Sequence, residues 1–199
     1  AVHTETIDGS VVFWHEEVAE GKVNSNAFSV RVSGTYTAKE EGEHSFGLHA
    51  AGYAKLFVDD SLVVDAWDNW SKGRTFFEEG CDERTGHVTL SAGQTVSVVM
   101  ELCTKPADNL YFTAFRFGVS RVLGQTEIDA AVAAASRCDT AVVFVGRSGE
   151  WDTEGSDLEN IDLPRNQNAL IDAVCATNPN TVVVLQTGGP VEMPWVMQA

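Results

Sequence analysis

The chain has 199 residues, of which 44% are hydrophobic, and it carries a formal net charge of -16 at pH 7. The hydrophobic content supports a buried core, which argues against a disordered chain, and the length suits one large or two small domains. The acidic excess argues against a nucleic-acid partner, because phosphate binding needs a basic surface, and equally against an anionic membrane.

The four cysteines do not predict a metal site, because none lies in a Cys-x-x-Cys pair. Cys138 and Cys175 fall in helical patterns, where buried small hydrophobic residues are expected. Cys81 and Cys103 flank a strand pair, and the sequence leaves open whether they form a disulfide or stay reduced. The first residues are not typical of a signal or transit peptide, and no apolar run approaches the ~18 residues of a membrane span.

Residues 1–120 predict a β-rich domain. Apolar and polar residues alternate through residues 28–36 and 44–50, as in strands with one buried face, so His44 and His49 are expected on the surface. Asp59 and Asp60 separate two apolar runs, which predicts a hairpin turn. Further strands are expected at residues 11–14, 55–58, 62–65, 87–90, 94–100 and 110–119. Short strands at regular spacing predict an antiparallel β-sandwich or barrel.

A segment rich in glycine and charge, residues 68–84, interrupts this β pattern. It is called the excursion below. Loops of this length are uncommon in compact β domains and are often functional.

Residues 121–199 predict part of a parallel α/β domain. Helices are expected at residues 125–137, with Thr126 as N-cap, at 165–177, and from residue 193 onward. Apolar strands covered on both faces are expected at residues 141–145 and 181–186. Two strands are too few for a free-standing sheet, so we expect chain outside these residues, or another molecule, to complete it.

An acidic loop, residues 149–157, follows the first of these apolar strands. Catalytic residues often lie in loops at the carboxyl ends of parallel strands. These carboxylates have three possible roles: solvated surface residues, a metal site, or the source of one general acid. Their spacing fits no calcium-loop template. Burial beside Trp151 would raise the pKa of such an acid. The residues alone leave these three readings open.

Motifs for other chemistries are missing from the sequence. It contains no G-x-x-x-x-G-K-S/T or G-x-G-x-x-G, so nucleotide binding is unsupported, and no G-x-S-x-G, so a serine hydrolase triad is unsupported. No cofactor is therefore expected.

Several motifs follow one another in a specific order through the second half of the chain. They are DTAVVFVG at 139–146, EWDTEGSD at 150–157, IDLP at 161–164, NQ at 166–167, NPNTVVV at 178–184 and PVEMPW at 190–195. In this order and spacing they resemble part of the second domain of glycoside hydrolase family 3 β-glucosidases. GEHSFGL at 42–48, KLFVDDSLVVD at 55–65 and AG at 92–93 resemble the protective-antigen-type β module (PA fourteen domain) inserted there in one branch of the family.

The resemblance implies a retaining glycosidase that acts on β-linked glucosides with a nucleophile and an acid/base. In the family the acid/base lies in the acidic loop, within a Glu-Gly-x-Asp-Arg pattern. Glu154 is therefore the implied acid/base and Glu150 the fallback, whereas Leu158 departs from the pattern's arginine. The family's nucleophile lies on a (β/α)8 barrel domain that residues 1–199 do not contain, so the chain alone is expected to be inactive.

The resemblance also implies that a module loop shapes the mouth of the active site. The excursion is the candidate loop, with Trp67, Trp70, Phe76 and Phe77 as substrate-stacking residues, and Trp151 is a further substrate-binding candidate. Ordinary packing is the alternative for each aromatic side chain. Related adhesin modules hold calcium through aspartates before the strand at residue 55, where this chain has none, so no metal is expected. A non-catalytic carbohydrate-binding or adhesion module remains the alternative function.

Overall fold

The computed structural model describes residues 1–106, 110–149, 151–152 and 157–199. The chain divides into two compact units, Ala1–Val122 and Leu123–Ala199, each with its own hydrophobic core.

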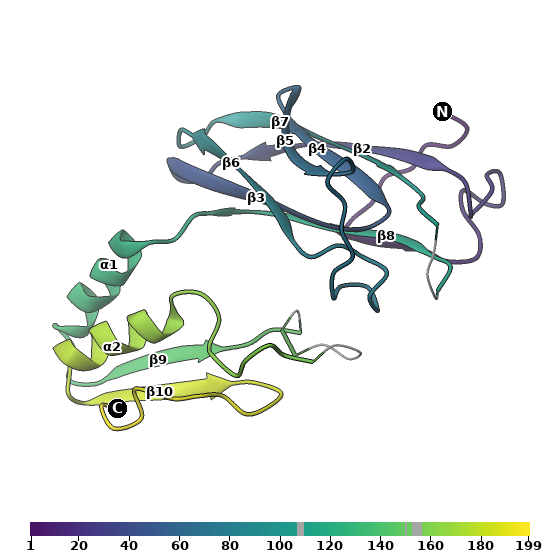
Figure 1. Ribbon diagram of the computed structural model, residues 1–199. Helices are drawn as coiled ribbons and strands as arrows, with labels where there is room; N and C mark the ends of the chain where they lie inside the picture. Colours follow the sequence, from purple (N-terminus) through teal and green to yellow (C-terminus); the bar gives the residue numbers. More distant parts are fainter. Residues whose placement is uncertain (107–109, 150, 153–156) are drawn as a thin grey trace. The chain divides into compact units, whose positions relative to one another are not determined.

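The first unit consists of two four-stranded antiparallel sheets (Figure 1). One has the strand order β1-β8-β3-β6 and the other β2-β7-β4-β5. The strands are β1 (Val11–Trp14), β2 (Ser29–Thr37), β3 (Gly42–Ala51), β4 (Tyr53–Val58), β5 (Ser61–Ala66), β6 (Arg84–Leu90), β7 (Thr95–Cys103) and β8 (Thr113–Arg121).

Alternating burial along the strands gives both sheets one shared core. In β4 every second residue is buried, and Leu56 lies in the same cluster as Phe46 of β3 and Phe115 of β8. Burial of each such side chain contributes roughly 1.5–3 kcal/mol to folding. The predicted hairpin turn at Asp59 and Asp60 is confirmed: it joins β4 to β5, and both residues have positive φ (45° and 64°), as a two-residue type I′ turn requires.

The prediction that His44 and His49 lie on the surface is wrong, since they are only 1% and 6% exposed. His44 lies on the core side of β3, where its ring centroid is 5.7 Å from that of Tyr36. His49 lies on the other side of β3, where the carboxylate of Glu83 packs against Gly47. Alternation predicted a solvated outer face, whereas the end of the excursion covers part of it.

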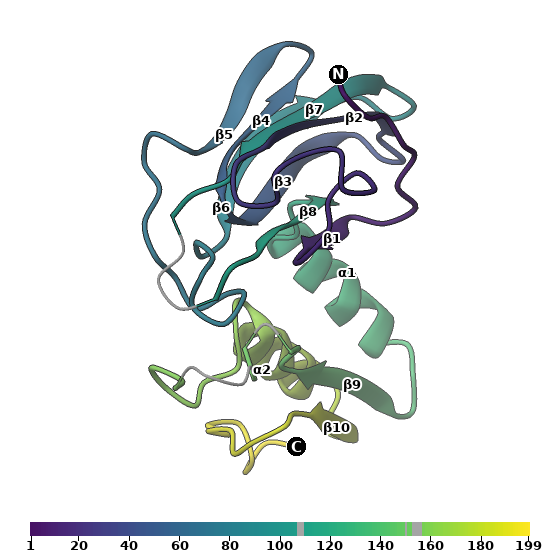
Figure 2. The ribbon, with the colours of Figure 1, turned by 90° about the vertical axis from the view of Figure 1, so that its right-hand side faces the viewer.

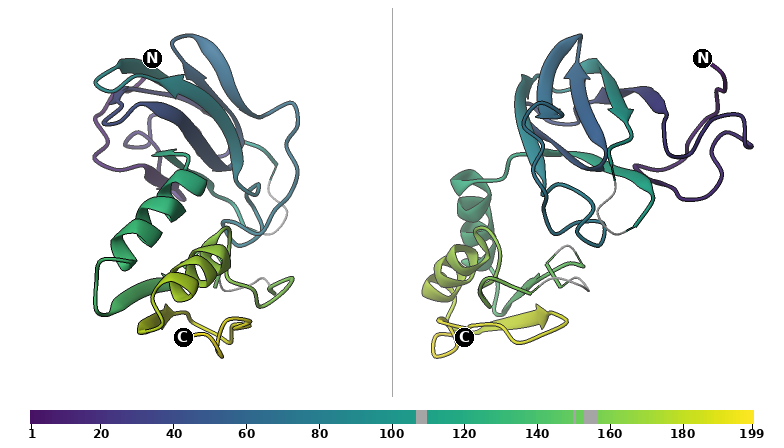
Figure 3. Two further views of the ribbon diagram at one scale, coloured as in Figure 1. Left: turned by 90° about the vertical axis from the view of Figure 1, so that its left-hand side faces the viewer. Right: turned by 45° about the vertical axis from the view of Figure 1, so that its right-hand side comes forward.

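The second unit consists of α1 (Gln125–Ala135), β9 (Ala141–Gly146), α2 (Gln167–Thr177) and β10 (Thr181–Gln186). The strands pair in parallel, as predicted. Figures 1 and 3 show α2 against one face of this sheet, with α1 beside α2. Ile171 and Val174 of α2 share a core cluster with Val143 of β9.

The outer face of this small sheet is apolar but exposed. Val142 is 52% exposed, Phe144 67% and Val182 49%. Within the described part of the chain, helices therefore cover one face only, whereas the sequence predicted cover on both.

Local details of the second unit differ from the prediction. Gly124 caps α1 in place of Thr126, because the carboxylate of Glu127 accepts a hydrogen bond from the Gly124 amide (2.6 Å). Cys138 is exposed rather than buried, since α1 ends before it. Residues 194–198 form turns rather than a helix.

All four cysteines are free thiols, so the possible Cys81–Cys103 bridge is not formed in the structure. Cys81 is buried, its Sγ accepts a hydrogen bond from the Ala50 amide (3.4 Å), and burial raises the pKa of this thiol. The helices of the described residues are too short or too polar for any of them to span a bilayer.

Candidate active site

The acidic loop begins where β9 ends, beside the carboxyl end of the parallel strand β10 (Figure 1). Of this loop the structure describes Gly149, Trp151, Asp152 and Asp157, and both Trp151 and Asp152 are half-buried. Glu154, the expected acid/base, and Glu150, the fallback, lie outside the described residues. The described part of the candidate site consists of the residues that flank them.

Gly146 and Gln167 fix the start of the acidic loop. The side-chain amide of Gln167, at the beginning of α2, accepts a hydrogen bond from the Gly146 amide (2.7 Å) and donates one to its carbonyl (2.8 Å). A Cβ atom at Gly146 would lie 1.9 Å from the Gln186 carbonyl oxygen of β10, so only glycine fits between the strands. The sequence placed Gln167 in a family motif without indicating this contact.

Arg147 joins the acidic loop to the loop after β10. Its side chain is 1% exposed, and its Nη2 lies 3.0 Å from Asp152 Oδ1 and donates to the Pro190 carbonyl (3.0 Å). The second carboxylate oxygen of Asp152 accepts a hydrogen bond from the Gly188 amide (2.8 Å). No local sequence pattern indicates this role for Arg147.

Three of the four aromatic candidates in the first unit are packed. Trp67 lies 6.2 Å from Tyr53 between ring centroids, and Trp70 lies under the ammonium group of Lys105 (4.9 Å to its ring centroid). Phe76 makes an edge contact with Phe13 (5.2 Å). Phe77, by contrast, is 59% exposed and is available to a ligand.

The excursion leaves the sheets as a long loop (Figure 2), yet it is fastened by a buried ion pair. Glu79 is 1% exposed and its carboxylate lies 3.2 Å from Lys105 Nζ, whose side chain is 7% exposed. Glu79 also accepts a hydrogen bond from the Leu110 amide (3.0 Å). The chain just before it, Phe76 to Glu78, has three consecutive positive φ angles (54°, 56° and 64°), a costly conformation that persists only where its surroundings fix it.

Asp65 anchors the start of the excursion. Its carboxylate accepts hydrogen bonds from the amides of Trp67 (2.8 Å) and Asp68 (2.9 Å) and lies 3.9 Å from Lys55 Nζ. The bond from the Trp67 amide is the main cause that lowers the pKa of Asp65, and the Asp68 amide and Lys55 add to it, against desolvation.

Because the folded-state pKa of Asp65 is lower than its unfolded value, the ionised carboxylate stabilises the fold above the unfolded pKa. This contribution is lost as the pH falls through the folded pKa. We therefore expect Asp65→Asn to lower the free energy of unfolding at pH 7, measured by urea unfolding. At pH 3 the free energies of unfolding of the variant and the wild type should differ less. Asp8→Asn, at an exposed position, is the control. A destabilisation by Asp65→Asn of equal size at both pH values would contradict the prediction.

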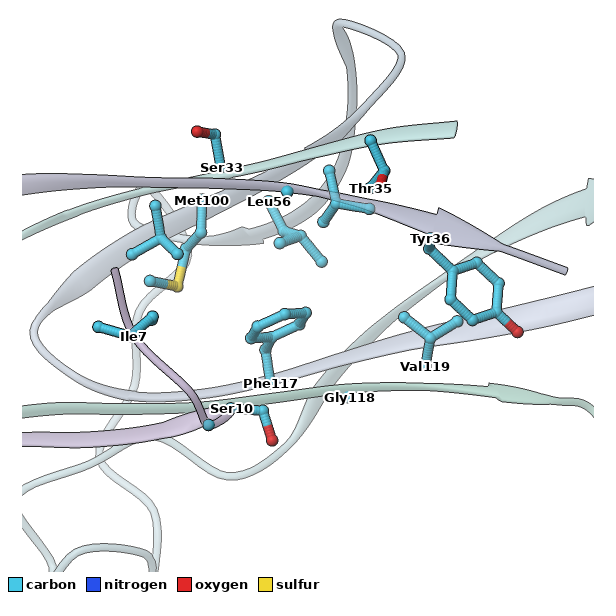
Figure 4. Close-up of a pocket in the computed structure, with 14 residues that line it drawn as sticks. Ile7, Ser10, Ser33, Thr35, Tyr36, Leu56, Met100, Phe117, Gly118 and Val119 are labelled. Carbon is cyan, nitrogen blue, oxygen red and sulfur yellow. The ribbon is translucent and has the colours of Figure 1, made fainter. Parts of the chain in front are cut away.

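A cavity of about 400 Å³ lies between the two sheets of the first unit (Figure 4). Its walls are largely nonpolar and include Ile7, Val32, Leu56, Met100 and Phe117. Among the residues that the structure describes, none of the site residues expected from the sequence lines it. Among the residues for which the structure gives positions, no group of three or more His, Cys, Asp or Glu side chains is arranged to hold a metal ion.

Comparison with known proteins identifies the family. The glycosyl hydrolase family 3 C-terminal domain model matches residues 17–199. A β-glucosidase of Rhizobium radiobacter is 47% identical over 197 residues, which cover 98% of this chain and 24% of that protein. A probable β-glucosidase I of Aspergillus terreus is 40% identical over 89% of this chain and 22% of its own length.

The crystal structure of a β-glucosidase from Kluyveromyces marxianus in complex with glucose is similar over 100% of this chain and 24% of its own, with 35% identity and a TM-score of 0.85. The chain thus spans about a quarter of the length of the relatives it matches. These matches confirm the resemblance to the family that the motifs of the second half carry: the chain belongs to glycoside hydrolase family 3 and matches the family's C-terminal domain.

Proposed function

We propose that this chain is part of a retaining β-glucosidase that hydrolyses terminal β-D-glucosyl residues, and that it supplies the general acid/base from the acidic loop. The observation that carries the proposal is the family match over residues 17–199, together with relatives that are named β-glucosidases. The start of the acidic loop supports it, because Gln167 and Arg147 bind this loop tightly to the end of the small parallel sheet.

In this mechanism Glu154 first protonates the departing glycosidic oxygen and then removes a proton from the attacking water. The nucleophile is an aspartate on a (β/α)8 barrel domain outside residues 1–199. In retaining enzymes the carboxyl groups of the nucleophile and the acid/base are about 5–5.5 Å apart. Trp151, which is half-buried, is a further substrate-binding residue in this proposal. No cofactor takes part.

The two units have different roles in this proposal. Residues 1–120 are a protective-antigen-type β-sandwich module, and Phe77 is its contact with the aglycone side of the substrate, supported by Trp67, Trp70 and Phe76. Residues 121–199 are part of an α/β sandwich domain. Further chain of the same enzyme covers the apolar face formed by Val142, Phe144 and Val182.

The test is hydrolysis of phenyl β-D-glucoside by the full-length polypeptide that contains this chain, followed by proton NMR. We expect β-glucose as the first product, which shows retention, and no hydrolysis by residues 1–199 alone. First release of α-glucose, or no hydrolysis by the full-length protein, would refute the proposal. The alternative, a non-catalytic carbohydrate-binding or adhesion module, is tested by calorimetric titration of residues 1–199 with oligosaccharides, with and without calcium. Calcium-dependent binding would favour this alternative.

A further inference from the structure

We propose that Arg147 is a positioning residue for the acid/base, because its buried guanidinium fixes Asp152, two residues before Glu154, against the loop after β10. The inference rests on the proposed function, since it assigns a task to Arg147 only if the acidic loop carries the acid/base. It adds a residue that belongs to none of the motifs that suggested the active site.

The contacts of Asp152 leave its side chain little freedom. One carboxylate oxygen lies 3.0 Å from Arg147 Nη2 and the other accepts the Gly188 amide at 2.8 Å. Arg147 in turn donates to the Pro190 carbonyl, on the far side of the same loop. Rotation of the Asp152 side chain would break the ion pair, the hydrogen bond to Gly188, or both.

The burial of this ion pair separates it from an ordinary surface salt bridge. The Arg147 side chain is 1% exposed and that of Asp152 is 17% exposed. A buried guanidinium needs a compensating anion, so Arg147 holds Asp152 in place rather than exchanging it for water.

Chain connectivity carries this restraint to residue 154. An extended chain spans at most about 3.6 Å per residue, so a residue two positions along the chain from a fixed residue cannot move far from it. Anchoring of Asp152 therefore limits where the acid/base can be. Misplacement of a catalytic group by about 1 Å can cost on the order of 100-fold in rate.

Arg147 is also incompletely satisfied, which is unusual for a side chain that serves stability alone. Its Nε and Nη1 atoms are buried and have no hydrogen-bond partner within the part of the chain that the structure describes. Buried polar groups are nearly always paired, and exceptions in native proteins call for an explanation such as a role at an active site. We infer that these two donors serve the assembled site.

Leaving-group dependence in the full-length enzyme distinguishes positioning from simple structural support. Phenyl β-glucoside needs protonation of its leaving group, whereas 2,4-dinitrophenyl β-glucoside does not. A displaced acid/base therefore lowers kcat/KM for the first substrate more than for the second. We expect Arg147→Leu to lower the ratio of kcat/KM for phenyl β-glucoside to kcat/KM for 2,4-dinitrophenyl β-glucoside by roughly 10–100-fold. This is part of the 10²–10⁴-fold that general acid catalysis supplies. Arg147→Lys should recover part of the lost ratio.

Asp152→Asn keeps the shape of the loop and provides a second, milder variant. We expect it to shift the ratio in the same direction, and the double variant to be no worse than Arg147→Leu, because the two residues act as one unit. Arg137→Leu, at an exposed arginine of the same unit, is the matched control and should leave the ratio unchanged. If Arg147→Leu fails to fold, Asp152→Asn decides the question.

An equal loss on both substrates by Arg147→Leu, or an unchanged ratio in Asp152→Asn, would overturn the inference. Glu154→Gln in the same series separates this outcome from failure of the proposed function. If Glu154→Gln changes the ratio and the Arg147 and Asp152 variants do not, only the positioning role is wrong. If Glu154→Gln retains full activity on phenyl β-glucoside, the acid/base assignment itself is wrong.

Discussion

Glu154→Ala in the full-length enzyme is expected to lower kcat/KM for phenyl β-glucoside by about 10²–10⁴-fold, the usual contribution of a general acid/base. The loss arises because the departing phenolate must leave without a proton. A substrate with a good leaving group forms the glycosyl-enzyme without acid assistance, so its hydrolysis then stalls at attack by water. Azide, which needs no general base, should restore turnover and give β-glucosyl azide, since two displacements retain configuration.

Two matched variants make this expectation specific to Glu154. Glu159→Ala removes an exposed carboxylate just beyond the same loop and should leave kcat/KM nearly unchanged. Glu150→Ala tests the fallback assignment. If azide rescue and leaving-group dependence appeared in Glu150→Ala and not in Glu154→Ala, the acid/base would be Glu150. If neither variant showed them, neither glutamate of this loop would be the acid/base.

The elements of this fold were predictable because their periodicity is local. Alternation along β2 and β3 and the apolar runs of β9 and β10 are features of each strand's own sequence, and the structure has strands at these positions. The turn at Asp59 was predictable for a similar reason, since short acidic residues tolerate the positive φ of a tight hairpin.

Contacts between distant residues could not be predicted in this way. His44 is buried against Tyr36, which lies on β2 in the opposite sheet, and His49 lies on the side of β3 where Glu83 of the excursion packs. Arg147 contacts a carbonyl 43 residues later, and no local pattern marks such a pair. The acidic loop was visible as a cluster of carboxylates, but only the resemblance to a family singled out Glu154.

Glu79→Ala is expected to reduce the free energy of unfolding of the first unit by about 3–5 kcal/mol, because it leaves the Lys105 ammonium buried without this carboxylate. The change also removes the acceptor of the Leu110 amide (3.0 Å). The neighbouring pair of Glu78 and Lys72 (3.6 Å) is far more exposed, so Glu78→Ala, the matched control, should cost less than about 1 kcal/mol.

Urea unfolding of the three proteins measures the energies, and amide hydrogen exchange in the excursion shows where the change acts. Faster exchange in Glu79→Ala should be concentrated in the excursion and around Leu110, since the ion pair joins these segments. The double variant Glu79→Leu with Lys105→Met should recover most of the loss, because a buried ion pair is often replaceable by apolar groups of similar volume. A loss in Glu79→Ala no larger than in Glu78→Ala would show that the ion pair does not fasten the excursion. The exposed Phe77 would then be presented by the backbone conformation of residues 76–78 rather than by the buried carboxylate beside it.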